Sequence, residues 1–149
     1  MGEEPRQPLG DPVLAALYAA FVGAGGEIGV SLLVGGGWIT GMLCSPRSWF
    51  EQVAFVVDEG TEGEMGLVFR MIGRSTYPTD DEVDAGVADP RPDDQIVGFL
   101  HLRDARAIGP TGSVPSDGRG LLRLRIEQVD GWMVGNLGEP GYSPPPPSV

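Results

Sequence analysis

The chain has 149 residues and a formal net charge of −11, and 24 glycines and 14 prolines interrupt a hydrophobic fraction of 41%. This length suits one domain with a real core, and the acidity argues against nucleic-acid binding, which depends on Lys and Arg to displace counterions. The absence of lysine excludes P-loop phosphate binding and Schiff-base chemistry, and a single histidine excludes metal sites built from several histidines.

A flexible N-terminus over residues 1–10 is expected to lead into a helix. Asp11 suits the N-cap and Pro12 the first helical position, and a cluster of glycines from Gly23 ends the helix. The predicted apolar stripe of this helix consists of Val13, Leu14, Leu17, Tyr18 and Phe21. The apolar run is too short to span a bilayer and lacks the basic flank of a signal peptide. We therefore expect a cytoplasmic protein without membrane insertion.

A β-hairpin followed by a helix is predicted next. Alternate apolar residues of 28–34 fall on one face of an extended chain, the glycines at 35–37 supply the positive φ of a tight turn, and residues 38–43 form the return strand. With Pro46 at the first position, a helix then runs to about Val57.

The middle of the chain is acidic. Residues 51–95 hold 12 Asp and Glu against three Arg, a net charge of −9. Residues 65–72 fit both the helical and the strand period, so either structure is open. The stretch from 75 to 95 has three prolines and little to bury, which predicts a mobile acidic loop because such a segment cannot offset its ordering entropy.

Three further strands are predicted in the last third of the chain. Residues 96–108 alternate as a strand, 109–118 read as a loop, and 121–128 read as a half-buried antiparallel strand. Asp130 and Gly131 give a strong hairpin signal, after which 132–137 form the last strand.

These elements predict an α+β fold. Five short strands under an amphipathic helix favour a small, mainly antiparallel, barrel-like domain of the SH3-like or Sm-like kind, with a helical and acidic insertion. We expect a single globular domain over residues 11–137 and a disordered, Pro-rich tail over 138–149.

Candidate catalytic and metal-binding residues are few. His101 could form a triad with Asp104 and a serine, but no serine stands in a G-x-S-x-G elbow, and a strand histidine is usually structural. Asp80, Glu82 and Asp84 alternate as calcium ligands do, yet the following glycine is misplaced for an EF-hand. The only cysteine excludes an internal disulfide. We expect no enzyme and no cofactor or metal.

Arginines form the one basic concentration. They either balance nearby carboxylates or dock an acidic partner or the chain's own acidic loop, and both interpretations stay open. Pairing of the arginines with acidic loops between molecules would give a salt-sensitive homo-oligomer. The candidate interaction residues are Arg103, Arg106, Arg119, Arg123 and Arg125.

Three stretches of the chain stand out together: IGVSLLVGGGWITGMLCSPRSWFEQVA, FLHLRDARAI and RIEQVDGWMVGNL, which cover about a third of its length. In their order and spacing these stretches resemble the gas vesicle accessory protein GvpU family. A variable acidic middle separates them and a variable tail follows. Where the family often has an aromatic residue before the arginine-containing strand, this chain has Gly120, Leu121 and Leu122.

The resemblance implies a small non-enzymatic protein that is made alongside gas vesicle shell proteins. It would act through contacts with gas vesicle proteins or the vesicle shell, in vesicle assembly or in the association of finished vesicles. The alternative is an Sm-like RNA-binding barrel or another interaction module unrelated to gas vesicles, although RNA binding would want a basic or aromatic ring.

Overall fold

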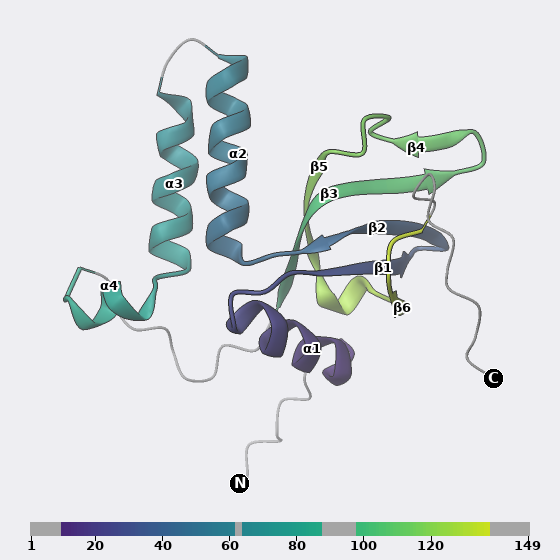
Figure 1. Cartoon of the computed structure of the whole chain (residues 1–149), viewed down its shortest axis with the longest axis horizontal. Coiled ribbons are helices and arrows are strands. Elements are labelled where there is room, and N and C mark those ends of the chain that lie inside the picture. The colour runs from purple at the N-terminus through teal and green to yellow at the C-terminus, as the bar shows by residue number, and fades with distance from the viewer. Residues whose placement is uncertain (1–9, 62–63, 88–97, 138–149) are drawn as a thin grey trace, which may run out of the picture.

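The computed structural model describes residues 10–61, 64–87 and 98–137, and its fold is α+β. An antiparallel sheet of six strands carries one helix against its core face, and a hairpin of two helices stands beside the sheet (Figure 1). Residues 1–9 of the predicted flexible N-terminus (1–10) and the predicted tail 138–149 lie outside the described residues.

The elements follow in chain order. They are α1 (Pro12–Gly23), β1 (Ile28–Val34), β2 (Gly37–Leu43), α2 (Pro46–Gly60), α3 (Met65–Thr76), α4 (Asp80–Asp84), β3 (Phe99–Gly109), β4 (Gly112–Val114), β5 (Gly120–Arg125), a 3-10 turn (Ile126–Gln128) and β6 (Gly131–Val134).

The predicted hairpin of β1 and β2 is confirmed. Its register runs from Ile28 opposite Leu43 to Val34 opposite Gly37. Gly35 and Gly36 turn the chain with φ of +57° and +82°, which are values that side chains disfavour.

The sheet is open. Its order is β4-β3-β2-β1-β6, and β5 also pairs with β3. Because β2 occupies one edge of β3, β4 and β5 lie one after the other along its second edge. No ladder joins β5 to β6 in the part of the chain that the structure describes, so the predicted SH3-like or Sm-like barrel is not confirmed.

The predicted hairpin turn at Asp130 and Gly131 is wrong. The 3-10 turn leads the chain away from β5 and across to the free edge of β1, where Gly131 lies opposite Leu33. Ile126, which begins this turn, is fully buried in the core. A second difference is β4, which lies in the predicted loop 109–118 and pairs with the end of β3.

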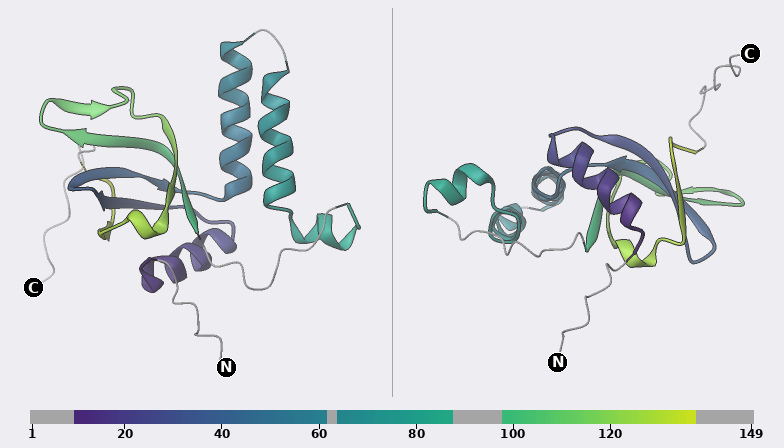
Figure 2. Two further views of the ribbon diagram at one scale, coloured as in Figure 1. Left: turned by 180° about the vertical axis from the view of Figure 1, so that it is seen from behind. Right: turned by 90° about the horizontal axis from the view of Figure 1, so that it is seen from below.

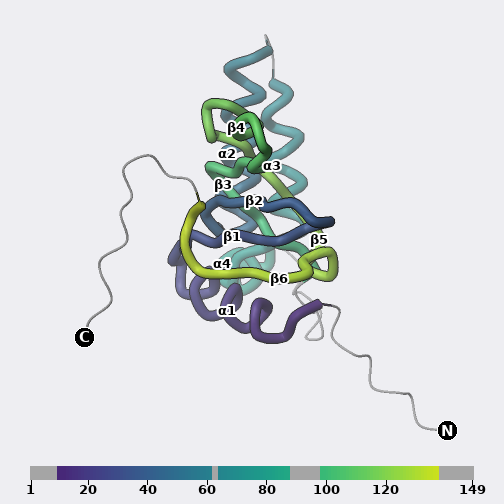
Figure 3. The backbone as a smooth tube through the Cα atoms, turned by 90° about the vertical axis from the view of Figure 1, so that its right-hand side faces the viewer, coloured from purple at the N-terminus to yellow at the C-terminus, as the bar shows by residue number. Residues whose placement is uncertain are grey.

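Helix α1 covers the core face of the sheet (Figure 2). Its residues Leu14, Tyr18 and Val22 are four apart and therefore share one side of the helix, where all three are buried. Figure 3 shows α1 lying below the edge formed by β1 and β6. The Asp11 carboxylate caps the helix by accepting from Val13 N (2.8 Å), and it also accepts from the indole Nε1 of Trp132 in β6 (2.8 Å).

Residues 65–72, for which the sequence allowed either a helix or a strand, are helical. Helix α3 packs antiparallel on α2 through two buried glycines, and a Cβ on Gly73 would lie 2.7 Å from the Cβ of Phe50. Arg70 bridges the two helices with ion pairs to Glu51 (3.1 Å) and Asp58 (3.2 Å).

The predicted acidic loop over 75–95 is wrong for residues 80–84, which form α4. Thr79 and Glu82 build a capping box, and the Glu82 carboxylate also pairs with Arg47 of α2. These contacts lower the pKa of Glu82 to about 2, with the Arg47 hydrogen bond as the main cause. Residues 88–95 of the predicted loop lie outside the described residues.

Candidate interaction surfaces

The sheet face opposite α1, called here the outer face, is polar. Ser31 and Thr40 are both buried there, and their hydroxyl oxygens lie 3.1 Å apart. The Ser31 hydroxyl donates to the carbonyl of Gly135 (2.7 Å), and Leu137 N donates to Thr40 Oγ1 (3.1 Å). The chain that follows β6 is thus fixed across the outer face by hydrogen bonds.

A polar pocket of about 350 Å³ opens on this face. Arg103 donates to both carboxylate oxygens of Glu27, which lowers the pKa of Glu27, and Arg106 donates to the carbonyl of Leu137 (2.6 Å). The lining residues are Thr40, Met42, Arg103, Asp104, Arg106, Asp117, Gly118 and Asn136.

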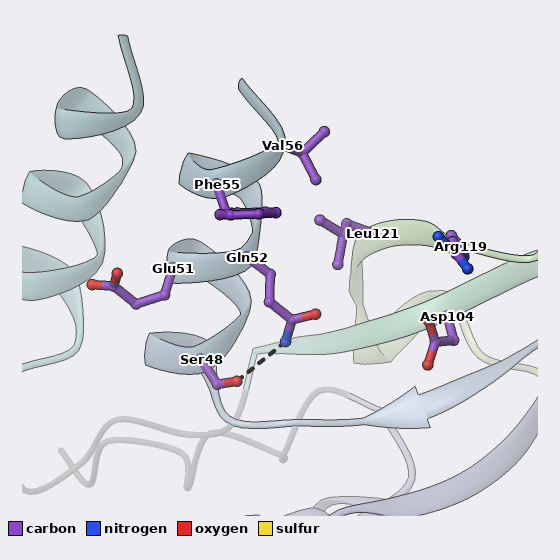
Figure 4. A pocket seen from close by; sticks show the side chains of 8 residues that line it. All are labelled: Ser48, Glu51, Gln52, Phe55, Val56, Asp104, Arg119 and Leu121. Atoms are coloured by element: carbon purple, nitrogen blue, oxygen red, sulfur yellow. Dashed lines mark hydrogen bonds between the residues drawn. The ribbon is translucent and has the colours of Figure 1, made fainter. Parts of the chain in front are cut away.

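A second hollow, called here the helix groove, lies between α2 and the start of β5 (Figure 4). It measures about 370 Å³. Val56 and Leu121 face each other across it, and Phe55 and Val56 are 59% and 57% exposed. The lining residues are Ser48, Glu51, Gln52, Phe55, Val56, Asp104, Arg119 and Leu121.

Arg119 stands at the mouth of the helix groove. Its backbone N–H donates to Asp117 (3.0 Å), but no hydrogen bond or ion pair joins its guanidinium to another described residue. The groove therefore combines apolar side chains with one available cation. Such a mixture suits the side chains of another polypeptide.

Asp104 borders both hollows. It sits at a bulge in β3 between Leu102 and Ala105, and its φ of +48° makes it the one non-glycine residue with positive φ in the described ranges. Its carboxylate accepts from Arg103, its sequence neighbour. Aspartate tolerates this conformation better than most residues, so the bulge and the residue type agree.

The predicted candidate His101 lies in an aromatic junction at the foot of α2. The ring is fully buried, with Trp49 and Tyr77 edge-on at centroid distances of 5.3 and 5.6 Å. Its Nε2 accepts from Arg123 Nε (3.1 Å), and its Nδ1 lies 3.4 Å from the Tyr18 hydroxyl. Burial, with a smaller contribution from the Arg123 charge, lowers the pKa of His101 to about 4.

The structure does not bring His101 and Asp104 together as a catalytic triad would require. The ring nitrogens of His101 face Arg123 and Tyr18, whereas the Asp104 carboxylate accepts from Arg103. At neutral pH the imidazole is uncharged and joins the helices to the sheet.

The five candidate arginines occupy different surroundings. Arg103 and Arg106 line the polar pocket, and Arg119 borders the helix groove. Arg123 is held in the junction, where it also donates to the Tyr77 hydroxyl (3.2 Å) and stacks 3.7 Å from the ring centroid of Phe99. Arg125 is 63% exposed and pairs with Glu127 at 3.4 Å.

Sequence reasoning missed an exposed apolar surface on α3, called here the α3 apolar face. Its residues are Met65, Leu67, Val68, Met71 and Ile72, which are 55%, 46%, 48%, 60% and 42% exposed. The sequence did contain a signal for this face. Gly66 and Gly73 are seven residues apart and therefore lie on the same side of a helix, which suits a close helix–helix contact and places most of the apolar residues on the opposite side.

The described ranges hold neither a cluster of metal ligands nor a helix that could span a membrane. In residues 10–61, 64–87 and 98–137, no group of three or more His, Cys, Asp or Glu could hold a metal ion. Over the same ranges, every helix is too short or too polar to cross a bilayer.

The fold and surfaces define a small α+β protein with an open antiparallel sheet, a projecting helical hairpin and two surface hollows. Residues 11–137 match the family described as gas vesicle protein GvpU-like, and the chain belongs to that family. No curated protein and no solved structure matches the chain.

Proposed function

We propose that this protein is a non-enzymatic gas vesicle accessory protein that acts through protein–protein contacts in vesicle assembly or in the association of finished vesicles. The family match over residues 11–137 carries the proposal. It also supports a location in the cytoplasm at gas vesicles, with gas vesicle proteins or the vesicle shell as partners.

The helix groove is the proposed contact surface for that partner. Phe55 and Val56 offer apolar area, and Arg119 offers a cation that no described residue engages. The engagement of His101 by Arg123 and Tyr18 supports a structural rather than a catalytic histidine. Contacts between acidic segments and arginines of different molecules would add a salt-sensitive self-association.

RNA binding by an Sm-like barrel is not favoured. The net charge of −11 opposes it, and four of the five candidate arginines already contact groups of this chain.

Flotation tests the proposed function. Wild-type protein in cells that make gas vesicles is expected in the buoyant fraction, and the double variant Phe55→Asp/Arg119→Glu is expected to lose most of this association. Arg125→Glu is the matched control, because Arg125 is exposed outside the groove. Absence of the wild-type protein from the buoyant fraction would refute the proposal, and unchanged flotation of the double variant would refute the groove as its surface.

A further inference from the structure

The α3 apolar face points away from the rest of the molecule. Helix α2 lies between α3 and the sheet (Figure 1). The side of α3 that meets α2 is formed by Gly66, Gly73 and Arg70. The five apolar side chains of the face lie elsewhere around the helix, and none is less than 42% exposed.

The α3 apolar face is a candidate interaction site by its composition and size. Five large side chains, each about half exposed, present on the order of a few hundred Å² of apolar surface, which matches the largest patch of a typical monomer, and such patches are often functional.

We propose that the α3 apolar face packs against the same face of a second copy of this chain, so that two α2–α3 hairpins form a four-helix bundle in a symmetric dimer. A helical hairpin that is apolar on its outer side is half of such a bundle. The hairpin stands beside the sheet, and α4 lies at the foot of α3 on the side away from α2, so the rest of the outer side of α3 is open to a second copy (Figure 2).

The charges on the hairpin favour a second copy as the occupant. Residues 51–95 carry a net charge of −9, yet the α3 apolar face contains no charged residue. Glu51 and Asp58 of α2 are paired with Arg70 on the side of α3 that faces α2. Two copies can therefore meet through α3 without placing these carboxylates against each other.

The ends of α3 are complementary in an antiparallel arrangement. Glu64 precedes the first turn and Arg74 lies in the last turn, and both side chains are exposed. An antiparallel pairing that places Val68 against Met71 of the second copy also brings Glu64 beside Arg74 of the second copy. A parallel pairing would instead place Glu64 beside Glu64.

The oligomeric state of the full chain tests the dimer. Light scattering on a sizing column is expected to give twice the mass of 15.7 kDa for the wild type, and the single-chain mass for Val68→Glu/Met71→Glu at the same loading. Val13→Glu is the matched control, because Val13 is 62% exposed on α1, and it is expected to remain a dimer. Circular dichroism confirms that each variant stays folded.

A charge exchange tests the orientation. Glu64→Arg and Arg74→Glu are each expected to weaken the dimer several-fold, because each places like charges together at both ends of the pair. The double exchange is expected to restore the wild-type dissociation constant. Single variants that bind as tightly as the wild type would overturn the antiparallel arrangement.

The proposal does not rest on the gas vesicle function, since these measurements use purified protein alone. An apolar interface is expected to persist at high salt, whereas self-association through arginines and carboxylates weakens. A wild-type chain that stays monomeric at every concentration overturns the dimer. This holds even if a different protein is then found to cover the α3 apolar face. A dimer that Val68→Glu/Met71→Glu leaves intact also overturns the proposal.

Discussion

His101 is a single residue that connects several elements of the fold. The ring touches α2, the region after α3, and β5 through Trp49, Tyr77 and Arg123, and its hydrogen bonds suit only the neutral imidazole. Sequence alone identified His101 as a strand residue of structural type. It could not identify the partners, because Arg123 and Tyr77 approach from distant parts of the chain.

The depressed pKa of His101 makes the folded protein sensitive to acid. The folded-state pKa of about 4 lies below the ordinary value of 6.5, so the unfolded chain binds the proton more readily between these two values. Stability is therefore full above pH 6.5 and falls by up to about 3 kcal/mol as the pH drops towards 4. Urea unfolding at pH 7 and pH 4.5 measures this loss.

A variant without the titrating ring isolates this effect. His101→Gln is expected to be less stable than the wild type at pH 7, but to lose much less stability between pH 7 and pH 4.5. Equal losses in the two proteins would show that groups other than His101 govern the acid response over this pH range.

At the level of elements, local signals were sufficient for the β1–β2 hairpin and for the starts of α1 and α2. Glycines, caps and prolines act within a few residues, so the sequence states them directly. The capping box of Thr79 and Glu82 was equally visible, and the acidic composition around it obscured the helix. The pairing of β6 with β1 was not visible, because it depends on contacts about 100 residues apart.

The α2–α3 contact depends on the absence of a side chain at Gly73. Gly73→Ala would improve helix propensity by about 1 kcal/mol, but its Cβ would lie 2.7 Å from that of Phe50. We expect a net destabilisation of about 1–3 kcal/mol from the overpacking, measured by thermal or urea unfolding. Gly60→Ala, at the end of α2 with open space around it, is the control and is expected to be neutral or stabilising.

At the scale of the whole molecule, one core joins α1 to the open sheet. The sequence indicated the apolar faces of the strands and part of the buried side of α1: Leu14 and Tyr18 of the predicted stripe are buried, whereas Val13 and Phe21 are exposed. It did not indicate that β5 pairs with β3 and β6 with β1, because the 3-10 turn at Ile126 carries the chain from one edge of the sheet to the other. The dispersal of the candidate arginines has the same origin, since the sheet order decides their neighbours.

The role of α1 as a cover for this core predicts unequal effects at neighbouring positions. Leu14 is fully buried and Val13 is 62% exposed. Leu14→Ala should lower the free energy of unfolding by about 2–5 kcal/mol, whereas Val13→Ala should change it by about 0.5 kcal/mol or less. Similar small effects at both positions would mean that α1 is dispensable for the fold.

Asp104, at the bulge in β3, lines both hollows. Its side chain lies between the helix groove and the polar pocket. A molecule that draws this carboxylate towards α2 competes with its ion pair to Arg103, which lines the polar pocket. Occupation of the helix groove is therefore expected to change the charge that Arg103 presents to the polar pocket.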